Sequence, residues 1–109
     1  MLSTEYKFGE VHKLSEQIES SKENVQFKHI FENANGGVAL IAFKAGQSLA
    51  EHLAPAEVMV YALEGEVEFT MIDKPHTLKA GEFFLIGQGV PHSVVALADS
   101  KIMLIKIKA

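Results

Sequence analysis

From residue 25 onward, short segments of the chain alternate in side-chain character with a period of two. Residues 25–31 and 67–71 show this most clearly, with Val, Phe, His or Met at every second position. Such a period is typical of a β-strand. Gly, Pro and Asn separate the segments at roughly the 8–12-residue spacing of an antiparallel sandwich or barrel, which predicts an all-β fold. The expected strands lie within residues 25–31, 38–43, 49–52, 58–63, 67–71, 76–78, 83–86, 92–97 and 102–107.

Residues 1–24 lack this pattern, and we interpret them as an N-terminal arm. The stretch 15–24 is polar and poor in core-forming residues. Val11, Leu14 and Ile18 are spaced as on one face of a short helix. We therefore expect either an arm with a short helix that packs on the barrel or on a partner subunit, or a frayed tail. With 109 residues, the chain has room for one core, in a single barrel domain over residues 25–109.

Two of the expected strands, residues 38–43 and 58–63, are apolar on both faces. A small barrel has only one interior, so the outer faces of these strands need a second dry environment. Either the N-terminal arm or another subunit could supply it. We expect a homodimer on this ground.

Composition excludes several classes of function. The chain contains no Cys, which removes disulfides, thiolate metal sites and cysteine nucleophiles. All 10 basic residues are Lys and the net charge is −4, which argues against a nucleic-acid partner. There is no apolar run of the ~20 residues that a membrane span needs. The N-terminus does not resemble a signal peptide, so we expect a cytoplasmic protein without a membrane partner.

Two stretches combine glycine and histidine at characteristic spacings. Residues 46–65 have Gly at both ends and His52 between them, and residues 81–92 begin with Gly and end in Gly89-Val-Pro-His92. Together they resemble the two signature motifs of the cupin superfamily, as found in small single-domain cupins. The resemblance implies a double-stranded β-helix, or jelly-roll barrel, with a ligand cavity inside. The matching residues are Gly46, His52, Gly65, Gly81, Gly89 and His92.

The resemblance also implies a metal site, but the chain departs from it. Cupins supply three His and one Glu at the positions that are His52, Ala54, Val58 and His92 here, so two ligands are missing. Two imidazoles alone bind a divalent transition metal weakly, because durable sites take about three or more protein ligands. Glu57 is one residue away from a motif position, which turns it to the opposite strand face unless a bulge re-aims it.

The expected metal ligands are therefore His52 and His92, with Glu57 only if such a bulge is present. Zinc, iron, manganese or nickel could occupy this site at low occupancy. The corresponding expected pocket is small and mostly apolar. Its residues are His52, Ala54, Val58, Val60 and His92.

These residues favour a protein that binds a small molecule in the barrel cavity through a two-histidine site. One alternative is a metal-dependent enzyme, similar to the cupin dioxygenases or isomerases, that uses His52 and His92 with a third ligand such as Glu57. Another is an isomerase or lyase without metal, in which a histidine shuttles a proton. The sequence does not decide whether the protein is an enzyme.

The other three histidines have simpler interpretations. His29 is expected to pack beside Phe27 and Phe31, or else to complete the pocket as a third imidazole. His76 follows a proline at a turn, and His12 lies in the polar arm. Both are expected at the surface.

Overall fold

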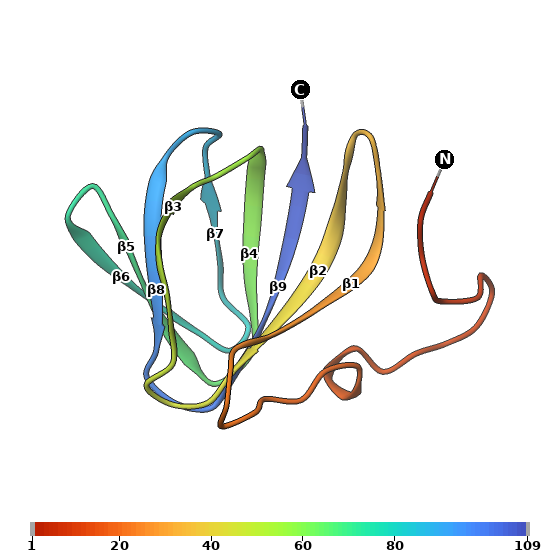
Figure 1. The fold of residues 1–109 in the computed structure, drawn as a ribbon, viewed down its shortest axis with the longest axis horizontal. Helices are drawn as coiled ribbons and strands as arrows, with labels where there is room; N and C mark the ends of the chain where they lie inside the picture. The colour runs from red at the N-terminus through yellow and green to blue at the C-terminus, as the bar shows by residue number, and fades with distance from the viewer. Residues whose placement is uncertain (1, 109) are drawn as a thin grey trace.

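The chain folds into two antiparallel sheets that enclose the core (Figure 1). The computed structural model describes residues 2–108. One sheet has five strands in the order β1-β2-β9-β4-β7, and the other has four in the order β3-β8-β5-β6, which confirms the predicted all-β jelly-roll barrel. A short 3-10 helix, η1 (Leu14–Glu16), precedes the strands. The strands are β1 (Gln26–Asn33), β2 (Gly36–Phe43), β3 (Ser48–Leu53), β4 (Glu57–Glu64), β5 (Glu66–Met71), β6 (Lys74–Lys79), β7 (Phe83–Ile86), β8 (Pro91–Ala96) and β9 (Ser100–Ile107).

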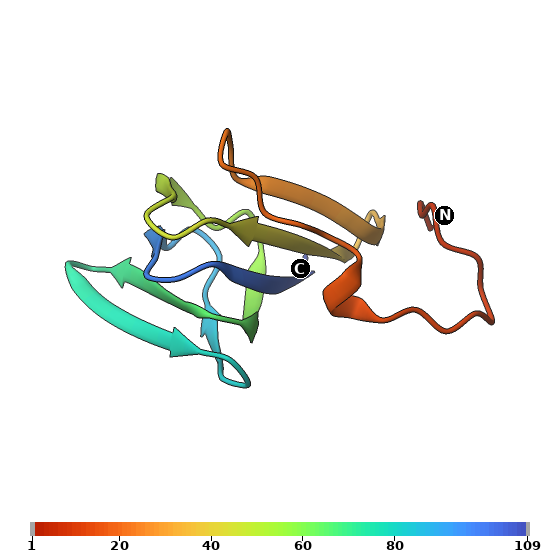
Figure 2. The same cartoon turned by 90° about the horizontal axis from the view of Figure 1, so that it is seen from below.

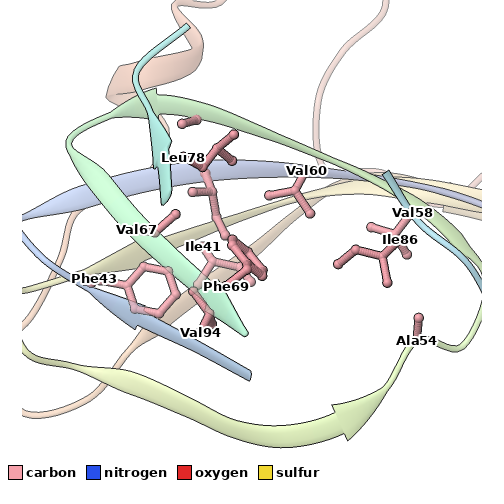
Figure 3. Close-up of a cluster of buried hydrophobic side chains, with 13 residues drawn as sticks. Ile41, Phe43, Ala54, Val58, Val60, Val67, Phe69, Leu78, Ile86 and Val94 are labelled. Atoms are coloured by element: carbon pink, nitrogen blue, oxygen red, sulfur yellow. The ribbon is translucent and has the colours of Figure 1, made fainter. Parts of the chain in front are cut away.

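The barrel core consists of the inward-facing side chains of both sheets (Figure 3). Along β4, Val58, Val60 and Ala62 are buried, whereas Met59 and Tyr61 are half-buried on the opposite face. This alternation follows from strand geometry, because successive side chains point to opposite faces. The buried members of the core cluster are Ile41, Phe43, Ala54, Val58, Val60, Ala62, Val67, Phe69, Leu78, Ile86, Val94, Ala96 and Ile102.

The turn between β4 and β5 depends on a glycine. Gly65 has a φ of 81°, and a Cβ at this position would overlap the Asp99 carbonyl oxygen and the Ser100 side chain. The buried Ser100 hydroxyl accepts a hydrogen bond from the Glu66 amide at 3.0 Å. Only glycine combines this backbone conformation with so close an approach of the neighbouring chain. The turn predicted at this position is confirmed.

Strand β1 is more exposed than its sequence pattern predicts. Phe27 is 61% exposed, Phe31 is 39% exposed, and His29 is also exposed. β1 is the edge strand of the larger sheet and lies beyond the smaller one, so no strand covers its inner face (Figures 1 and 2). A bulge between His29 and Phe31 also shifts the register, which turns Phe31 to the outer face beside its partner Val38. The expectation that these residues form a half-buried face was wrong.

The N-terminal arm covers part of the outer face of the five-stranded sheet. Ile18 is 7% exposed and clusters with the buried residues Leu40 and Ala42 of β2. The Lys101 ammonium of β9 donates a hydrogen bond to the Ser15 carbonyl oxygen at 2.6 Å, which attaches η1 to the sheet. The start of the arm extends past the barrel on the side away from the four-stranded sheet (Figure 2). The arm thus supplies part of the cover that the doubly apolar strands require, chiefly over β2.

The rest of that outer face stays open. Phe83 and Leu85 of β7 are 57% and 66% exposed, and they pair laterally with Tyr61 and Met59 of β4. Met59 pairs in turn with Ile105 of β9. These five residues form a continuous row of apolar side chains across three strands, which we call the outer strip.

Within residues 2–108, no helix has the length and apolar character needed to cross a membrane.

Candidate functional site

A cavity of about 240 Å3 lies between the two sheets, at the end of the barrel where β3 ends and β8 begins. Its lining is apolar except for two histidines and one lysine. Aliphatic and aromatic side chains with a few polar groups among them are the usual composition of a small-molecule site. The lining residues are Ile41, Leu49, His52, Leu53, Pro55, Val58, Val60, Phe69, Ile86, His92, Val94, Ile102, Leu104 and Lys106.

The pairing of β3 with β8 brings the two histidines together. His52 and His92 are direct cross-strand partners, so their side chains point to the same face. Their ring centroids are 4.2 Å apart, and the ring planes are inclined by 59°. A bulge between Leu49 and His52 sets this register. The predicted convergence of two imidazoles that are far apart in the chain is therefore present.

Backbone carbonyls fix the protonation pattern of both rings. Nδ1 of His52 lies 2.9 Å from the Ala50 carbonyl oxygen, and Nδ1 of His92 lies 3.1 Å from that of Val90. A carbonyl oxygen only accepts hydrogen bonds, so each Nδ1 must carry the proton. In the neutral ring Nε2 is then an unprotonated acceptor. The site thus offers two Nε2 lone pairs to a ligand.

The environment keeps His92 neutral. Its side chain is 7% exposed, and burial lowers its pKa below the ordinary value of 6.5. The Val90 carbonyl raises the pKa, while charge on the adjacent His52 lowers it, and the net shift is downward. His52 is more exposed than its partner. His92 is therefore a neutral acceptor near pH 7.

Lys106 is the third polar group of the cavity, and the sequence analysis did not identify it. Lys106 of β9 is the cross-strand partner of Val58 of β4. Because partners in a ladder share one face of the sheet, both side chains face the interior. A signal was present in the sequence, since Ile102, Leu104 and Lys106 share one parity of β9. Only the pairing of β9 with β4 shows which of the two alternating sets of β9 side chains points inward. A lysine thus joins the two histidines in the lining of the cavity.

The remaining predicted site residues divide into two groups. His52, Val58, Val60 and His92 line the cavity, whereas Ala54 is buried in the core cluster and is not part of the lining. Of the alternatives for His29, the structure places it outside the lining of this cavity, on exposed β1.

Comparison with known proteins adds the family to this geometry. The family model for the cupin domain matches residues 39–107. The chain belongs to the cupin family. The match spans the strands that carry both histidines and Lys106, so the cavity of this cupin is the barrel interior of the family fold. A search of the curated proteins gives no match.

Several solved structures resemble this one closely in fold. A cupin superfamily protein from Desulfitobacterium hafniense has a TM-score of 0.87 at 17% identity, covering 94% of each chain. A conserved protein of unknown function from Streptococcus pyogenes has a TM-score of 0.87 at 19% identity, covering 95% of this chain and 91% of its own. An RmlC-like cupin from Desulfovibrio desulfuricans has a TM-score of 0.80 at 27% identity, covering 90% and 95%. The architecture of this cupin is thus shared, while its site must be assessed from its own residues.

The residues present in this cupin do not fit the metal centre that the family resemblance implies. Ala54 and Val58 have no donor atom, and Glu57 is exposed, where its Oε2 accepts a hydrogen bond from the Gln88 amide at 3.3 Å. Among residues 2–108, no group of three or more His, Cys, Asp or Glu side chains is placed to hold a metal ion. Two imidazoles fall short of the usual ligand set.

The lowered pKa of His92 predicts a pH-dependent stability. As the pH falls, His92 becomes protonated near pH 6.5 in the unfolded chain but only at a lower pH in the folded chain. Acid therefore favours unfolding. The contribution of neutral His92 is complete above this pH and is lost as the pH falls to the folded pKa. Urea unfolding at about pH 7.5 and about pH 5 should show a smaller loss of stability in His92→Gln than in the parent. His76→Gln, on exposed β6, is the control. An identical pH dependence in parent and His92→Gln would contradict the shift.

Proposed function

We propose that this cupin binds a small, largely apolar molecule in its barrel cavity, with His52 and His92 as hydrogen-bond acceptors. One observation supports this most directly: the two rings, 4.2 Å apart, line an apolar cavity of about 240 Å3. Burial of the ligand's apolar body would provide affinity, at roughly 25 cal/mol per Å2 removed from water. A hydroxyl or amide N–H on the ligand would satisfy the Nε2 atoms and set its orientation.

The size of the cavity limits the ligand. A dry apolar cavity of about 150 Å3 accepts benzene. The volume of the present cavity exceeds this by about the room that one polar substituent needs. The ligand of matching size is therefore a single ring or a short branched chain with one functional group. Large sugars and nucleotides exceed this volume.

Filling the cavity should abolish binding. Val60→Phe puts a ring into the space that the ligand would use, while Met59→Phe adds a ring on the outer face of the same strand. We expect benzyl alcohol, as a representative of a panel of small alcohols and phenols, to shift the NMR signals of the His52 and His92 rings. Val60→Phe should weaken this binding at least tenfold, and Met59→Phe should leave it unchanged.

Thermal unfolding of both variants checks that the fold persists, because overpacking costs about 1–3 kcal/mol. Equal binding by Val60→Phe and the parent would place the ligand elsewhere. If no member of the panel perturbs His52 and His92 in the parent, the proposed function fails.

A metal-dependent enzyme is the second candidate, and the two Nε2 atoms available as ligands favour it. Two imidazoles without a third ligand should give weak, exchangeable binding. Purification without chelator, followed by metal analysis, should therefore find well under one equivalent per chain of zinc, iron, manganese, nickel and copper together. About one equivalent of one metal, lost in His52→Ala, would instead establish the enzyme-type site and displace the first proposal.

We also propose that the chain forms a homodimer through the outer strip. An extended apolar surface of this kind marks an interaction site. The groove beside the strip, about 300 Å3 in volume, is lined in part by Phe31, Val38 and Ile107. The same chain presents apolar side chains that could fill such a groove, since Phe8 is 79% and Val11 100% exposed on the arm. A second copy of the chain is the occupant we propose. In a two-fold symmetric dimer, the arm of each copy would fill the groove of the other, so that both contacts form twice.

A charge inside the outer strip should separate the subunits. Leu85→Glu introduces a carboxylate at a position that is 66% exposed in the monomer, and Ile72→Glu introduces the same charge at an 80% exposed turn away from the strip. Light scattering coupled to size exclusion should give a dimer for the parent and for Ile72→Glu, and a monomer for Leu85→Glu. A monomeric parent at low micromolar concentration would overturn the dimer.

A further inference from the structure

Lys106 is one of the residues that line the cavity. On β9 it lies between Val58 of β4 and Gly37 of β2, its cross-strand partners. Val58 is a short apolar side chain of the lining, and Gly37 contributes no side chain at all. The next polar side chain in this row is Glu32 of β1, the partner of Gly37, and within residues 2–108 no ion pair joins it to Lys106.

No carboxylate is paired with Lys106 in the part of the chain that the structure describes. Ion pairs within residues 2–108 involve three other lysines, and the cavity lining contains no acidic residue. The side chain is nevertheless half-buried. A cation that is partly removed from water gains most from an anion placed against it. The lining thus has one unpaired positive charge and no negative one.

The residues around Lys106 add to the positive charge near the cavity mouth. A second, smaller pocket of about 140 Å3 shares Pro55 and Lys106 with the cavity. Its lining adds Lys108, His29 and the carboxylate of Glu32. Two lysines and one glutamate leave a positive balance where the two pockets meet. An anionic group there would leave the apolar cavity free for the rest of the ligand.

From these observations we infer that the ligand class is a small monocarboxylate, with its apolar body in the cavity and its carboxylate at Lys106. This inference rests on the proposed binding function and names its ligand class. A single ammonium suits one negative charge, whereas a phosphate group usually engages several donors or a bidentate Arg, which this chain lacks. A dicarboxylate would bury its second charge against aliphatic side chains, at a large desolvation cost.

The test compares an acid with its neutral isostere. Phenylacetate and phenylacetamide have nearly the same shape but differ in charge and in hydrogen-bond donors, so the change in their affinity ratio when Lys106 is replaced, and not the ratio by itself, reports the anion site. The parent should bind phenylacetate at least tenfold more tightly than phenylacetamide, by calorimetry at neutral pH. Lys106→Met keeps most of the aliphatic stem and removes the charge, and it should bring this ratio to about one or below.

Lys74→Met is the matched control, because Lys74 is exposed on β6 and does not line the cavity. It should keep the parental ratio. A ratio near one in the parent, or a ratio unchanged in Lys106→Met, overturns the carboxylate inference while benzyl alcohol binding leaves the proposed function standing. If neither aryl compound nor the alcohol panel binds the parent, both proposals fail together.

Discussion

The division of each strand into an inward and an outward row is the constraint on which the rest of this molecule depends. On β4, Val58 and Val60 belong to the cavity, while Met59 and Tyr61 belong to the outer strip. A shift of one residue in register would exchange these rows and move the cavity lining to the surface. Burial of the core therefore fixes the register. The same register places Lys106 beside Val58 and so determines the charge of the cavity.

Within this frame the barrel is packed unevenly along its length. Phe43, Val67 and Leu78 gather at one end of the core, whereas Val58 and Ile86 lie at the other (Figure 3). Only the latter group contributes to the cavity lining. The core is thus closed around Phe43, Val67 and Leu78, and the cavity lies toward Val58 and Ile86. Lys106 pairs with Val58 at this end, and His52 and His92 line the same cavity from the other sheet.

Much of this could be predicted from the sequence, because a period of two specifies both the strands and their faces. The resemblance to the cupin motifs implied the convergence of His52 with His92, and the outward position of Glu57 agrees with its parity on β4. β1 was misjudged because exposure depends on whether an opposite strand exists, which no local pattern records. Lys106 was missed for a related reason: its parity on β9 was visible, but only pairing with β4 shows which parity faces the interior.

The loss of the motif ligands changes the chemistry of the cavity rather than removing it. With aliphatic residues at two ligand positions, the imidazoles lack two partners of the family's metal site, and burial together with charge on the adjacent His52 favours the neutral form of His92, whose pKa is lowered. The Ala50 and Val90 carbonyls hold Nδ1 of the two rings, so Nε2 is the ring atom that each histidine leaves for a ligand. Their acceptor character complements the one donor-only group of the lining, Lys106. A ligand that satisfies all three must therefore carry an anionic acceptor for the lysine and a hydrogen-bond donor for the histidines.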